Sequence, residues 1–475
     1  MTTHNRGGIA LLCLLLVPIG CGSNEPKQST TLEQPVVVDE DGDGSPAEED
    51  CDDADASRTP GAIELCDGVD NDCDASTDDA GRITWLSGST ATDLTPASPG
   101  ELTELDLDAA GTLSLCEGVH ALSLVVTADV DIQALDGHAV TLDGGGEATV
   151  VEVAAGATAV SLSGVTITGG TTGSAAVNRG GGLHCHTTAQ LTITDTSFVD
   201  NQGASGAGMG LADGCEASLV DVVFEGNEAA EYGGGIHLEG GSLTLTGVLF
   251  DSNVGPSGGG AIWAMDADTV SLTDVELTNN EGYEGGGLGL DTIASVTIIG
   301  GEFNRNAAED GGAIWLSNTD LSIEGTAFVR NAAYGAGGGI ASNFYSDISV
   351  DQAVFDRNSS RQWGGAARIY SSTMAVTDST FTGNSASWYG GALASYDAAG
   401  TGSSQMNVFN SAFSDNSAGR QGGALAVTEY SSLRGSGIDF SGGNAPDDYA
   451  RDGGSSYTGD SNTSINCPAG RTTCS

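Results

Sequence analysis

Short stretches in which apolar and polar residues alternate recur along most of the chain. Residues 243–246 (LTLT) and 296–298 (VTI) are examples, and each is followed closely by glycine. Alternation with a period of two is typical of a β-strand that buries one face, and helical periodicity is nowhere sustained. The pattern therefore predicts an all-β chain built from many short strands.

These strands belong to a repeat marked by the motif Phe-x-x-Asn. Successive asparagines of the motif are 26, 26, 27, 26, 25, 27, 26 and 32 residues apart. Leu277 replaces phenylalanine in one copy, and Phe440 begins a degenerate tenth copy. The phenylalanines are Phe198, Phe224, Phe250, Phe303, Phe328, Phe355, Phe381 and Phe413. The asparagines, which we name the turn ladder, are Asn201, Asn227, Asn253, Asn280, Asn306, Asn331, Asn358, Asn384 and Asn416.

Two further series share this period. One aliphatic residue stands five positions before each Phe or Leu of the motif, and another follows the glycine cluster that comes after each asparagine. The first series is Ile193, Leu219, Leu245, Leu272, Ile298, Ile323, Val350, Val376 and Val408. The second is Leu183, Leu211, Ile236, Ile262, Leu288, Ile314, Ile340, Ala367, Leu393 and Leu425. We expect both series to point into one core.

The length of the repeat selects the architecture. A propeller blade needs about 40 residues, and a leucine-rich repeat has its own consensus. A unit of this length with two or three short strands suits one coil of a parallel β-helix, in which coils stack about 4.8 Å apart. Asparagine would serve one turn, because it tolerates left-handed backbone and its amide can hydrogen-bond from coil to coil. Glycine would serve a second, tighter turn.

The sequence G-G-A-I stands at residues 259–262 and 311–314, and G-G-A-L stands at 390–393 and 422–425. Together with Phe-x-x-Asn, it resembles the repeats of the polymorphic outer-membrane protein family over about residues 180–430. The resemblance implies an all-β, right-handed, single-stranded parallel β-helix (a pectin-lyase-like solenoid) of roughly a dozen coils. We expect it at residues 111–445, with an N-terminal cap at 81–110 and a C-terminal cap at 446–475. The fold says little about function.

Residues 39–80 form a separate acidic module. From Asp39 to Asp79, 17 of 41 residues are acidic, and Arg58 is the only cation. Alternating carboxylates separated by glycines can direct several oxygens at one hard cation, and Ca²⁺ takes six to eight. The alternative is a solvated acidic spacer. The candidate metal ligands are Asp39, Asp41, Asp43, Asp50, Asp52, Asp53, Asp55, Asp67, Asp70, Asp72 and Asp74.

The module contains D-x-D-G-D-G, D-C-D-D-x-D and P-G-A-x-E-x-C-D-G-V-D-N-D-C-D. These resemble a metal-binding motif of exported bacterial proteins that is related to the copper-binding MopE family. The family suggests copper. The module offers carboxylates and no histidine, however, whereas copper favours histidine and thiolate. We therefore expect Ca²⁺, with copper as the less favoured metal.

Residues 1–20 are expected to be a lipoprotein signal peptide. Arg6 precedes an apolar stretch at 9–19 that is too short to span a bilayer. Residues 17–21 (VPIGC) resemble a bacterial lipobox, although Pro18 departs from it. The resemblance implies lipid on Cys21 and attachment to the outer membrane or cell surface. The residues that follow are polar and contain two prolines, so we expect a tether at 21–38. The alternative is an ordinary signal peptide with a coincidental cysteine.

Export would also favour disulfides among the remaining cysteines. Cys467 and Cys474 enclose a short loop and are expected to pair. Cys185 and Cys215 lie about one repeat apart and could join neighbouring coils. The partners of Cys51, Cys66, Cys73 and Cys116 cannot be read from their spacing.

Charge excludes one class of partner. Acidic residues outnumber basic ones 65 to 14, for a formal net charge of −51. Such a chain repels nucleic acid. Adaptation to high salt is another reading of this acidity.

No catalytic constellation is recognised, so we expect no enzymatic activity. A zinc site at His184 and His186, which flank Cys185, is not favoured, because both histidines should face outward. The same alternation predicts an outward column that includes exposed tryptophans, which could stack on sugar rings. The column is His184, Ala212, His237, Trp263, Gly289, Trp315, Ala341 and Arg368.

The leading hypothesis is a lipid-anchored, cell-surface structural or adhesive β-helix with a Ca²⁺-binding module. Its partners would be the membrane, through the lipid, and possible glycans or surface proteins. The alternative is a β-helix that binds or cleaves polysaccharide, in the manner of a lyase.

Overall fold

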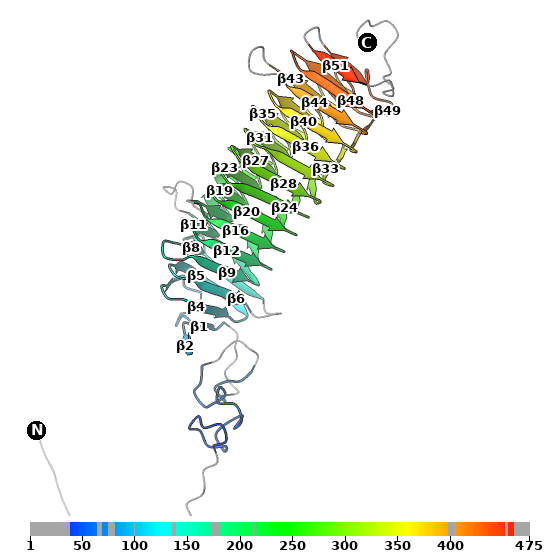
Figure 1. The fold of residues 1–475 in the computed structure, drawn as a ribbon. Coiled ribbons are helices and arrows are strands. Elements are labelled where there is room, and N and C mark those ends of the chain that lie inside the picture. The colour runs from blue at the N-terminus through cyan, green and yellow to red at the C-terminus, as the bar shows by residue number, and fades with distance from the viewer. Residues whose placement is uncertain are drawn as a thin grey trace, which may run out of the picture.

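The computed structural model describes residues 39–63, 69–74, 81–98, 100–134, 139–172, 180–212, 214–397, 404–451 and 455–459. Most of them form one long rod of stacked strands (Figure 1). The rod is all-β, and its strands wind into a parallel solenoid of about 12 turns. The expected β-helix is thereby confirmed. Within the described residues, no helix is long and apolar enough to cross a bilayer.

The coils contribute strands to three long ladders, which we name sheets A, B and C, and from β14 (Gln202–Ser205) to β46 (Ser417–Ala418) also to a fourth, nine-stranded ladder, which we name the narrow sheet. In those coils, one turn runs from sheet B through sheet A and sheet C to the narrow sheet, and then returns to sheet B one coil further on. Within each ladder, the strands of successive coils pair in parallel. Sheets B and C share their first long strand and together form a 26-stranded sheet.

Sheet A is 16-stranded and begins with an antiparallel hairpin, after which all of its strands are parallel. Its strands are β1 (Ile83–Ser87), β2 (Thr90–Asp93), β4 (Gly111–Leu115), β6 (Val130–Ala134), β9 (Ala159–Ser163), β12 (Gln190–Thr194), β16 (Glu216–Val220), β20 (Ser242–Thr246), β24 (Thr269–Thr273), β28 (Ser295–Ile299), β32 (Leu321–Glu324), β36 (Asp347–Asp351), β40 (Thr373–Thr377), β44 (Gln405–Phe409), β48 (Ser432–Ser436) and β51 (Ser456–Gly459).

Sheet B follows the glycine clusters. Its strands are β3 (Thr103–Leu107), β5 (Gly118–Val126), β8 (Val151–Val153), β11 (Leu183–Cys185), β15 (Met209–Leu211), β19 (Ile236–Glu239), β23 (Ile262–Met265), β27 (Leu288–Asp291), β31 (Ile314–Ser317), β35 (Ile340–Asn343), β39 (Ala367–Tyr370), β43 (Leu393–Tyr396), β47 (Leu425–Thr428) and β50 (Tyr449–Arg451).

Sheet C carries the phenylalanines, and the narrow sheet follows the asparagines. Besides β5, the strands of sheet C are β7 (Val140–Asp143), β10 (Val165–Thr168), β13 (Ser197–Val199), β17 (Val223–Glu225), β21 (Leu249–Asp251), β25 (Glu276–Thr278), β29 (Glu302–Asn304), β33 (Ala327–Val329), β37 (Val354–Asp356), β41 (Thr380–Thr382), β45 (Ala412–Ser414) and β49 (Asp439–Gly442). The narrow sheet comprises β14 (Gln202–Ser205), β18 (Glu228–Tyr232), β22 (Val254–Gly255), β26 (Glu281–Gly282), β30 (Ala307–Ala308), β34 (Ala332–Ala333), β38 (Ser359–Ser360), β42 (Ser385–Ala386) and β46 (Ser417–Ala418).

The core consists of columns of like side chains. Phe198 pairs with Phe224, which pairs with Phe250, and the rings of each pair stack with centroids 4.8 Å apart. The column continues through Leu277 to Phe413, and all of its members are buried. Burying one phenylalanine stabilises a fold by about 1.5–3 kcal/mol. Because every coil repeats this burial, the columns carry much of the stability of the rod.

The turn ladder lies inside the rod, and all nine predicted asparagines are fully buried. In a typical step, the side chain of Asn227 donates to Oδ1 of Asn253 over 2.9 Å and to the carbonyl of Phe198 over 2.9 Å. The backbone amide of Asn227 donates to the same Oδ1 over 3.2 Å. Asn444 extends the ladder by one rung that the spacing did not reveal.

Two details of the predicted stacking were wrong. The left-handed residue of the turn precedes each asparagine: Ser252, for example, has φ 58°, and Asn253 itself is not left-handed. Asparagine stands there for its hydrogen bonds. In sheet B, Leu183 pairs with Met209, whereas Leu211 pairs with Cys185, two residues further along the strand. Met209 and Leu211 are both buried in the core. The predicted series contains Leu211 in place of Met209, so its register in this coil is wrong by two residues.

The glycine clusters form the turn between the narrow sheet and sheet B, as expected. A Cβ at Gly312 would lie 2.3 Å from the carbonyl oxygen of Gly338 on the next coil. Backbones of neighbouring coils thus approach too closely for a side chain. At the N-terminal end, the antiparallel hairpin β1–β2 covers the edge of β4.

Candidate functional site

The acidic module lies beyond the β1–β2 end of the rod (Figure 1). Within it, Asp39, Asp41 and Asp43 each bring a carboxylate oxygen within 4.8 Å of the others. Gly42 and Gly44, with φ of 81° and 103°, make the turn possible. Their backbone amides donate to the two oxygens of Asp39 over 2.7 and 3.2 Å. The turn therefore folds the chain around its own carboxylates.

Several of these carboxylates are held by one oxygen only. Oδ1 of Asp41, Asp43 and Asp50 accepts the backbone amide two residues further along, over 3.1, 2.7 and 2.8 Å. Their Oδ2 atoms, and Oδ1 of Asp70, are shielded and have no hydrogen-bond partner among the described residues. Such oxygens lack the compensation that buried polar groups require.

The carboxylate of Asp41 is repelled by other carboxylates nearby. Burial raises the pKa of Asp41, and the neighbouring charges of Asp43, Asp50 and Asp39 raise this pKa further. An opposite charge placed among these carboxylates would reverse the effect. The donor set consists of carboxylate oxygens, which a hard cation prefers.

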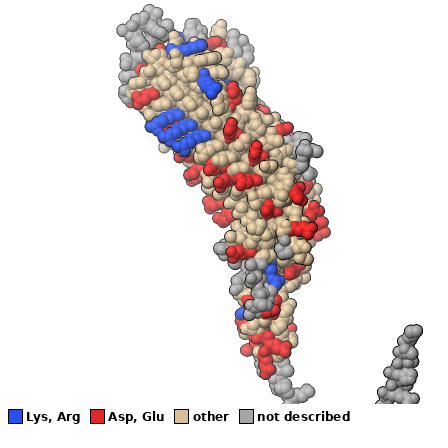
Figure 2. Space-filling model, turned by 180° about the vertical axis from the view of Figure 1, so that it is seen from behind, with Lys and Arg blue, Asp and Glu red and all other residues tan. Residues whose placement is uncertain are grey.

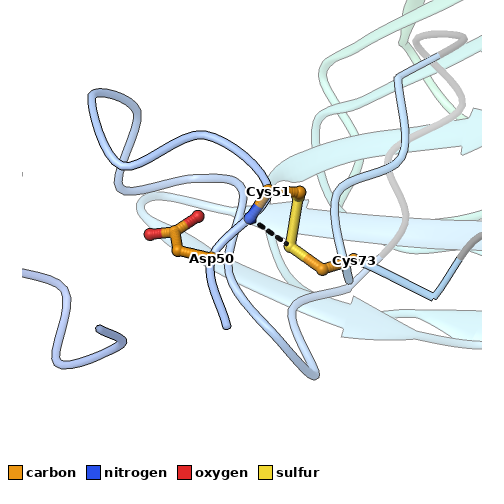
Figure 3. Close-up of side chains that lie close together, drawn as sticks. All are labelled: Asp50, Cys51 and Cys73. Carbon is orange, nitrogen blue, oxygen red and sulfur yellow. Dashed lines mark hydrogen bonds between the residues drawn. A yellow bond between two sulfur atoms is a disulfide. The ribbon is translucent and has the colours of Figure 1, made fainter. Parts of the chain in front are cut away.

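A disulfide fixes the second half of the module. Cys51 and Cys73 are bonded, with Cα atoms 5.5 Å apart, and Asp50 lies beside them (Figure 3). The backbone amide of Cys51 approaches Sγ of Cys73 over 3.2 Å. Because both sulfurs are bonded to each other, neither is a thiolate ligand here. The disulfide thus joins the two halves of the module and leaves the carboxylates as donors.

Other predicted ligands have different contacts. Asp52 forms an ion pair with Arg58 over 2.8 Å. Asp53 accepts the backbone amide of Glu40 over 3.0 Å. Asp55 accepts both the amide and the hydroxyl of Ser57, which lowers its pKa. Asp72 accepts the backbone amide of Asp74 over 3.0 Å. Asp67 lies outside the described residues.

Among the predicted cysteines, Cys185 and Cys215 form a disulfide between neighbouring coils, with Cα atoms 6.4 Å apart. Cys116 is also disulfide-bonded. Five cysteines lie outside the described residues: Cys13, Cys21, Cys66, Cys467 and Cys474.

A second candidate site is a groove on the outside of sheet B, in the C-terminal half of the rod. It consists of two adjoining hollows of about 570 and 280 Å³. Both are lined by Trp363, Trp388 and Glu429. Because its lining residues come from successive coils, the groove follows the rod axis.

Aromatic rings line this groove in contact with one another. Tyr370 stacks on Tyr396 with centroids 5.2 Å apart, and Trp363 lies 5.3 Å from Tyr396. Phe344 meets Tyr370 edge-on at 5.0 Å. Trp388 is 37% exposed, so part of its ring remains accessible.

Several aromatic residues beside the groove have a strained, left-handed backbone. Phe344 and Tyr345 are consecutive left-handed residues, with φ of 38° and 51°, and Tyr430 has φ 67°. Large side chains are rare in this region. In the neighbouring coils, the position of Phe344 is occupied by Asn318 and Ser371. The coils at the groove therefore carry rings where small polar residues would cost less.

The floor of the groove holds a buried cation. Arg368 donates to the carbonyl of Ser342 over 2.9 Å and to Asn343, and it pairs with Asp310 over 3.4 Å. The backbones of Glu284 and Asp310 form an isolated parallel β-bridge, which brings the two acidic residues onto neighbouring coils. Burial, followed by repulsion from Asp310, raises the pKa of Glu284 to about 7.

The predicted outward column is partly wrong. Gly210, and not Ala212, pairs with His184 and His237. Trp263 and Trp315 are buried, at 5% and 6% exposure, and stack on each other at 5.7 Å. Trp263 is covered by the return loop at Gly258 and by the ring of Tyr232, and strand alternation alone does not reveal such a cover.

The histidines are also covered. His184 and His237 are buried, and burial lowers the pKa of His237 to about 4. The rings of His184 and His186 stack at 5.2 Å. Among the described residues, the groups able to hold a metal lie in the acidic module and include no histidine.

The fold and the module define a parallel β-solenoid preceded by an acidic, disulfide-linked segment. Residues 182–360 and 234–408 match a family model described as "Right handed beta helix region". Residues 50–79 match a second model described as "Putative metal-binding motif", named for copper-binding MopE. No curated protein and no solved structure matches the chain significantly.

Proposed function

We propose that this protein is a lipid-anchored structural or adhesive rod of a bacterial cell surface, with an acidic module that binds Ca²⁺. The lipid would be attached to Cys21. The module would then lie between the anchor and the rod, where a bound cation would stiffen the connection. The solenoid would hold its binding surfaces away from the membrane.

One observation carries the Ca²⁺ proposal. Asp41, Asp43 and Asp50 each use one oxygen to fix a turn and keep the other shielded and without a hydrogen-bond partner among the described residues. Asp41 and Asp43, together with Asp39, also bring carboxylate oxygens within 4.8 Å of one another, and converging carboxylate oxygens are ligands for a hard cation. Copper is less favoured because the module contains neither histidine nor, at Cys51 and Cys73, a free thiol.

Calorimetry on the full-length protein tests the module. We expect Ca²⁺ to bind the wild type and D106N/D108N, which removes two exposed carboxylates elsewhere. We expect D41N/D43N to weaken binding at least tenfold. No heat at millimolar Ca²⁺ would leave the module as an acidic spacer. If Cu²⁺ bound the wild type more tightly than Ca²⁺ and D41N/D43N lost this binding, the proposed site would stand and the proposed metal would be wrong.

The anchor is tested separately. Metabolic labelling with a fatty-acid analogue should mark the wild type and not C21S, and C21S should leave the membrane fraction. Labelling that is unchanged in C21S would refute the lipid attachment proposed here.

A second candidate function is binding of a neutral carbohydrate chain in the groove of sheet B. Accessible aromatic faces can stack on sugar rings, and Arg368, Asp310 and Glu429 offer hydrogen-bonding groups nearby. Titration of cellohexaose, xylohexaose and chitohexaose, followed by tryptophan fluorescence, tests this function. W363A/W388A should lose binding, whereas Y283A, which removes an exposed ring elsewhere, should not. New reducing or unsaturated ends on incubation would show cleavage in addition to binding.

A further inference from the structure

The turn between sheet C and the narrow sheet carries three arginines in one column. Asn304, Val329 and Asp356 are in register, and the next residue of each coil is Arg305, Arg330 or Arg357. The amide of Arg305 donates to the carbonyl of Val329 over 2.9 Å, and the amide of Arg330 donates to that of Asp356 over 2.9 Å. The three arginines therefore stand one above another, about 4.8 Å apart per coil.

Arginine is an unusual residue at this position. All three are left-handed, with φ of 55°. Other coils place Asp200, Gly226, Ser252, Asn279, Gly383 and Asp415 there. Glycine and short polar residues adopt left-handed backbone at little cost, and an arginine does not. Strain that persists in three successive coils indicates that the side chain serves something other than the turn.

The column is also largely unneutralised. All three arginines are exposed. Arg357 pairs with Asp356 over 3.0 Å, while no carboxylate of the described residues is within ion-pair distance of Arg305 or Arg330. In a chain with 65 acidic and 14 basic residues, acidic partners would be easy to supply. Like charges kept this close repel one another unless an anion lies between them.

The surface around the column is open. Ala307, Ala332 and Ser359, which begin the adjoining strands β30, β34 and β38, are small. Figure 2 shows basic side chains lying parallel in one block on the upper half of the rod, while acidic side chains dominate the lower half. Lys27 is the only lysine of the chain and lies outside the described residues, so this basic surface consists of arginine.

We infer that the column of Arg305, Arg330 and Arg357 binds a linear polyanion that carries carboxylates or sulfates at intervals of about one sugar ring. Each guanidinium presents a planar fork that matches such groups in a bidentate manner. The ligand lies parallel to the rod axis, because the column does. This site is distinct from the groove of sheet B and from the acidic module.

The net charge of the protein does not prevent this binding. The Debye length is about 8 Å at physiological ionic strength, so distant carboxylates are largely screened. A polymer in contact with the column interacts mainly with the guanidinium groups. Binding should therefore persist at 0.15 M NaCl and weaken as salt rises further.

Polygalacturonate and dextran sulfate, with neutral dextran as a control, are suitable probes for biolayer interferometry. The full-length protein is used with EGTA present, so that Ca²⁺ cannot bridge carboxylates. We expect binding of at least one polyanion and none of dextran. The two polyanions distinguish carboxylate from sulfate recognition.

Matched variants separate the column from general charge. R305Q/R330Q/R357Q should bind at least tenfold more weakly. R82Q/R434E changes the net charge by the same three units at other positions and should stay within twofold of wild type. R305K/R330K/R357K should be intermediate, because lysine keeps the charge and loses the fork. Far-UV circular dichroism verifies that each variant is folded.

Three results would overturn the inference. They are equal losses in the two charge-matched variants, binding that survives in R305Q/R330Q/R357Q, and a wild-type protein that binds neither polyanion at millimolar sugar concentration. The second result would assign any binding to another surface, such as the groove of sheet B.

Discussion

Asn306 is the most informative position for testing how the turn ladder stabilises the rod. Its Oδ1 accepts the backbone amide of Asn280 over 3.0 Å and the side-chain amide of Asn280 over 2.9 Å. Its Nδ2 donates to the carbonyl of Leu277 over 2.7 Å and to Oδ1 of Asn331 over 3.1 Å. All four groups lie in a turn from which solvent is excluded.

The size of the effect follows from the groups left without partners. In N306A, the amide of Asn280 and the carbonyl of Leu277 lose these hydrogen bonds, whereas the side chain of Asn280 still donates to the carbonyl of Phe250. An unsatisfied buried group costs about 1–3 kcal/mol, so two of them cost about 2–6 kcal/mol. N306D keeps the shape but turns a donor into an acceptor that faces two oxygens. It should destabilise at least as strongly.

Urea unfolding followed by far-UV circular dichroism gives the free energy, and hydrogen–deuterium exchange gives the location. Repeat proteins can open locally, so exchange should rise first around residues 277–281 and 303–307. N318D makes the same chemical change at an exposed, left-handed position and should stay within about 0.5 kcal/mol of wild type. If N306D were equally harmless, the ladder would fill space without contributing hydrogen-bond energy.

Three other predictions follow from single features. Because Glu284 has a pKa of about 7 in the fold, the folded state binds its proton more tightly than the unfolded state, and stability should fall as pH rises from about 4.5 to 7; E284Q should flatten this slope in thermal melts, and an unchanged slope would exclude Glu284. Removing the disulfide with C185A/C215A should cost about 3–4 kcal/mol in urea unfolding. W263A should cost about 3–5 kcal/mol, because the ring is buried between Tyr232 and Trp315; a loss below 1 kcal/mol would show that the covering loops open readily.

The repeating interior could be predicted from the sequence because each column of the core requires the same kind of side chain in every coil. Phenylalanines in register must be apolar and similar in size, and the asparagines must bond to each other, so both recur at visible intervals. Met209 was missed because an unbranched side chain can fill the same inward position as an aliphatic one. The identity of the left-handed residue was missed because it varies between coils.

The outer sites were harder to predict because loops create them. Trp263 is buried by the return loops, and the groove beside Trp363 and Trp388 depends on how far these loops extend from the rod. The arginine column, in contrast, had a signal that went unused: Arg-Asn stands at 305–306, 330–331 and 357–358, in step with the turn ladder. In the acidic module, the alternating aspartates were visible, whereas which of them converge depends on individual turns.

The two charged sites should act independently, and this follows from the geometry of the solenoid. In sheet C, β29, which precedes Arg305, is the seventh strand beyond β5, and β5 lies near the module end of the rod. At about 4.8 Å a step the separation is about 34 Å, several times the Debye length of about 8 Å. Ca²⁺ bound at Asp41 and Asp43 should therefore leave the polyanion affinity of the arginine column unchanged. For the same reason, D41N/D43N and R305Q/R330Q/R357Q should each weaken one binding activity at least tenfold and spare the other. The protein can thus bind a cation beside its proposed anchor and a polyanion further along the same axis, because the rigid stack of coils keeps the two charged sites apart.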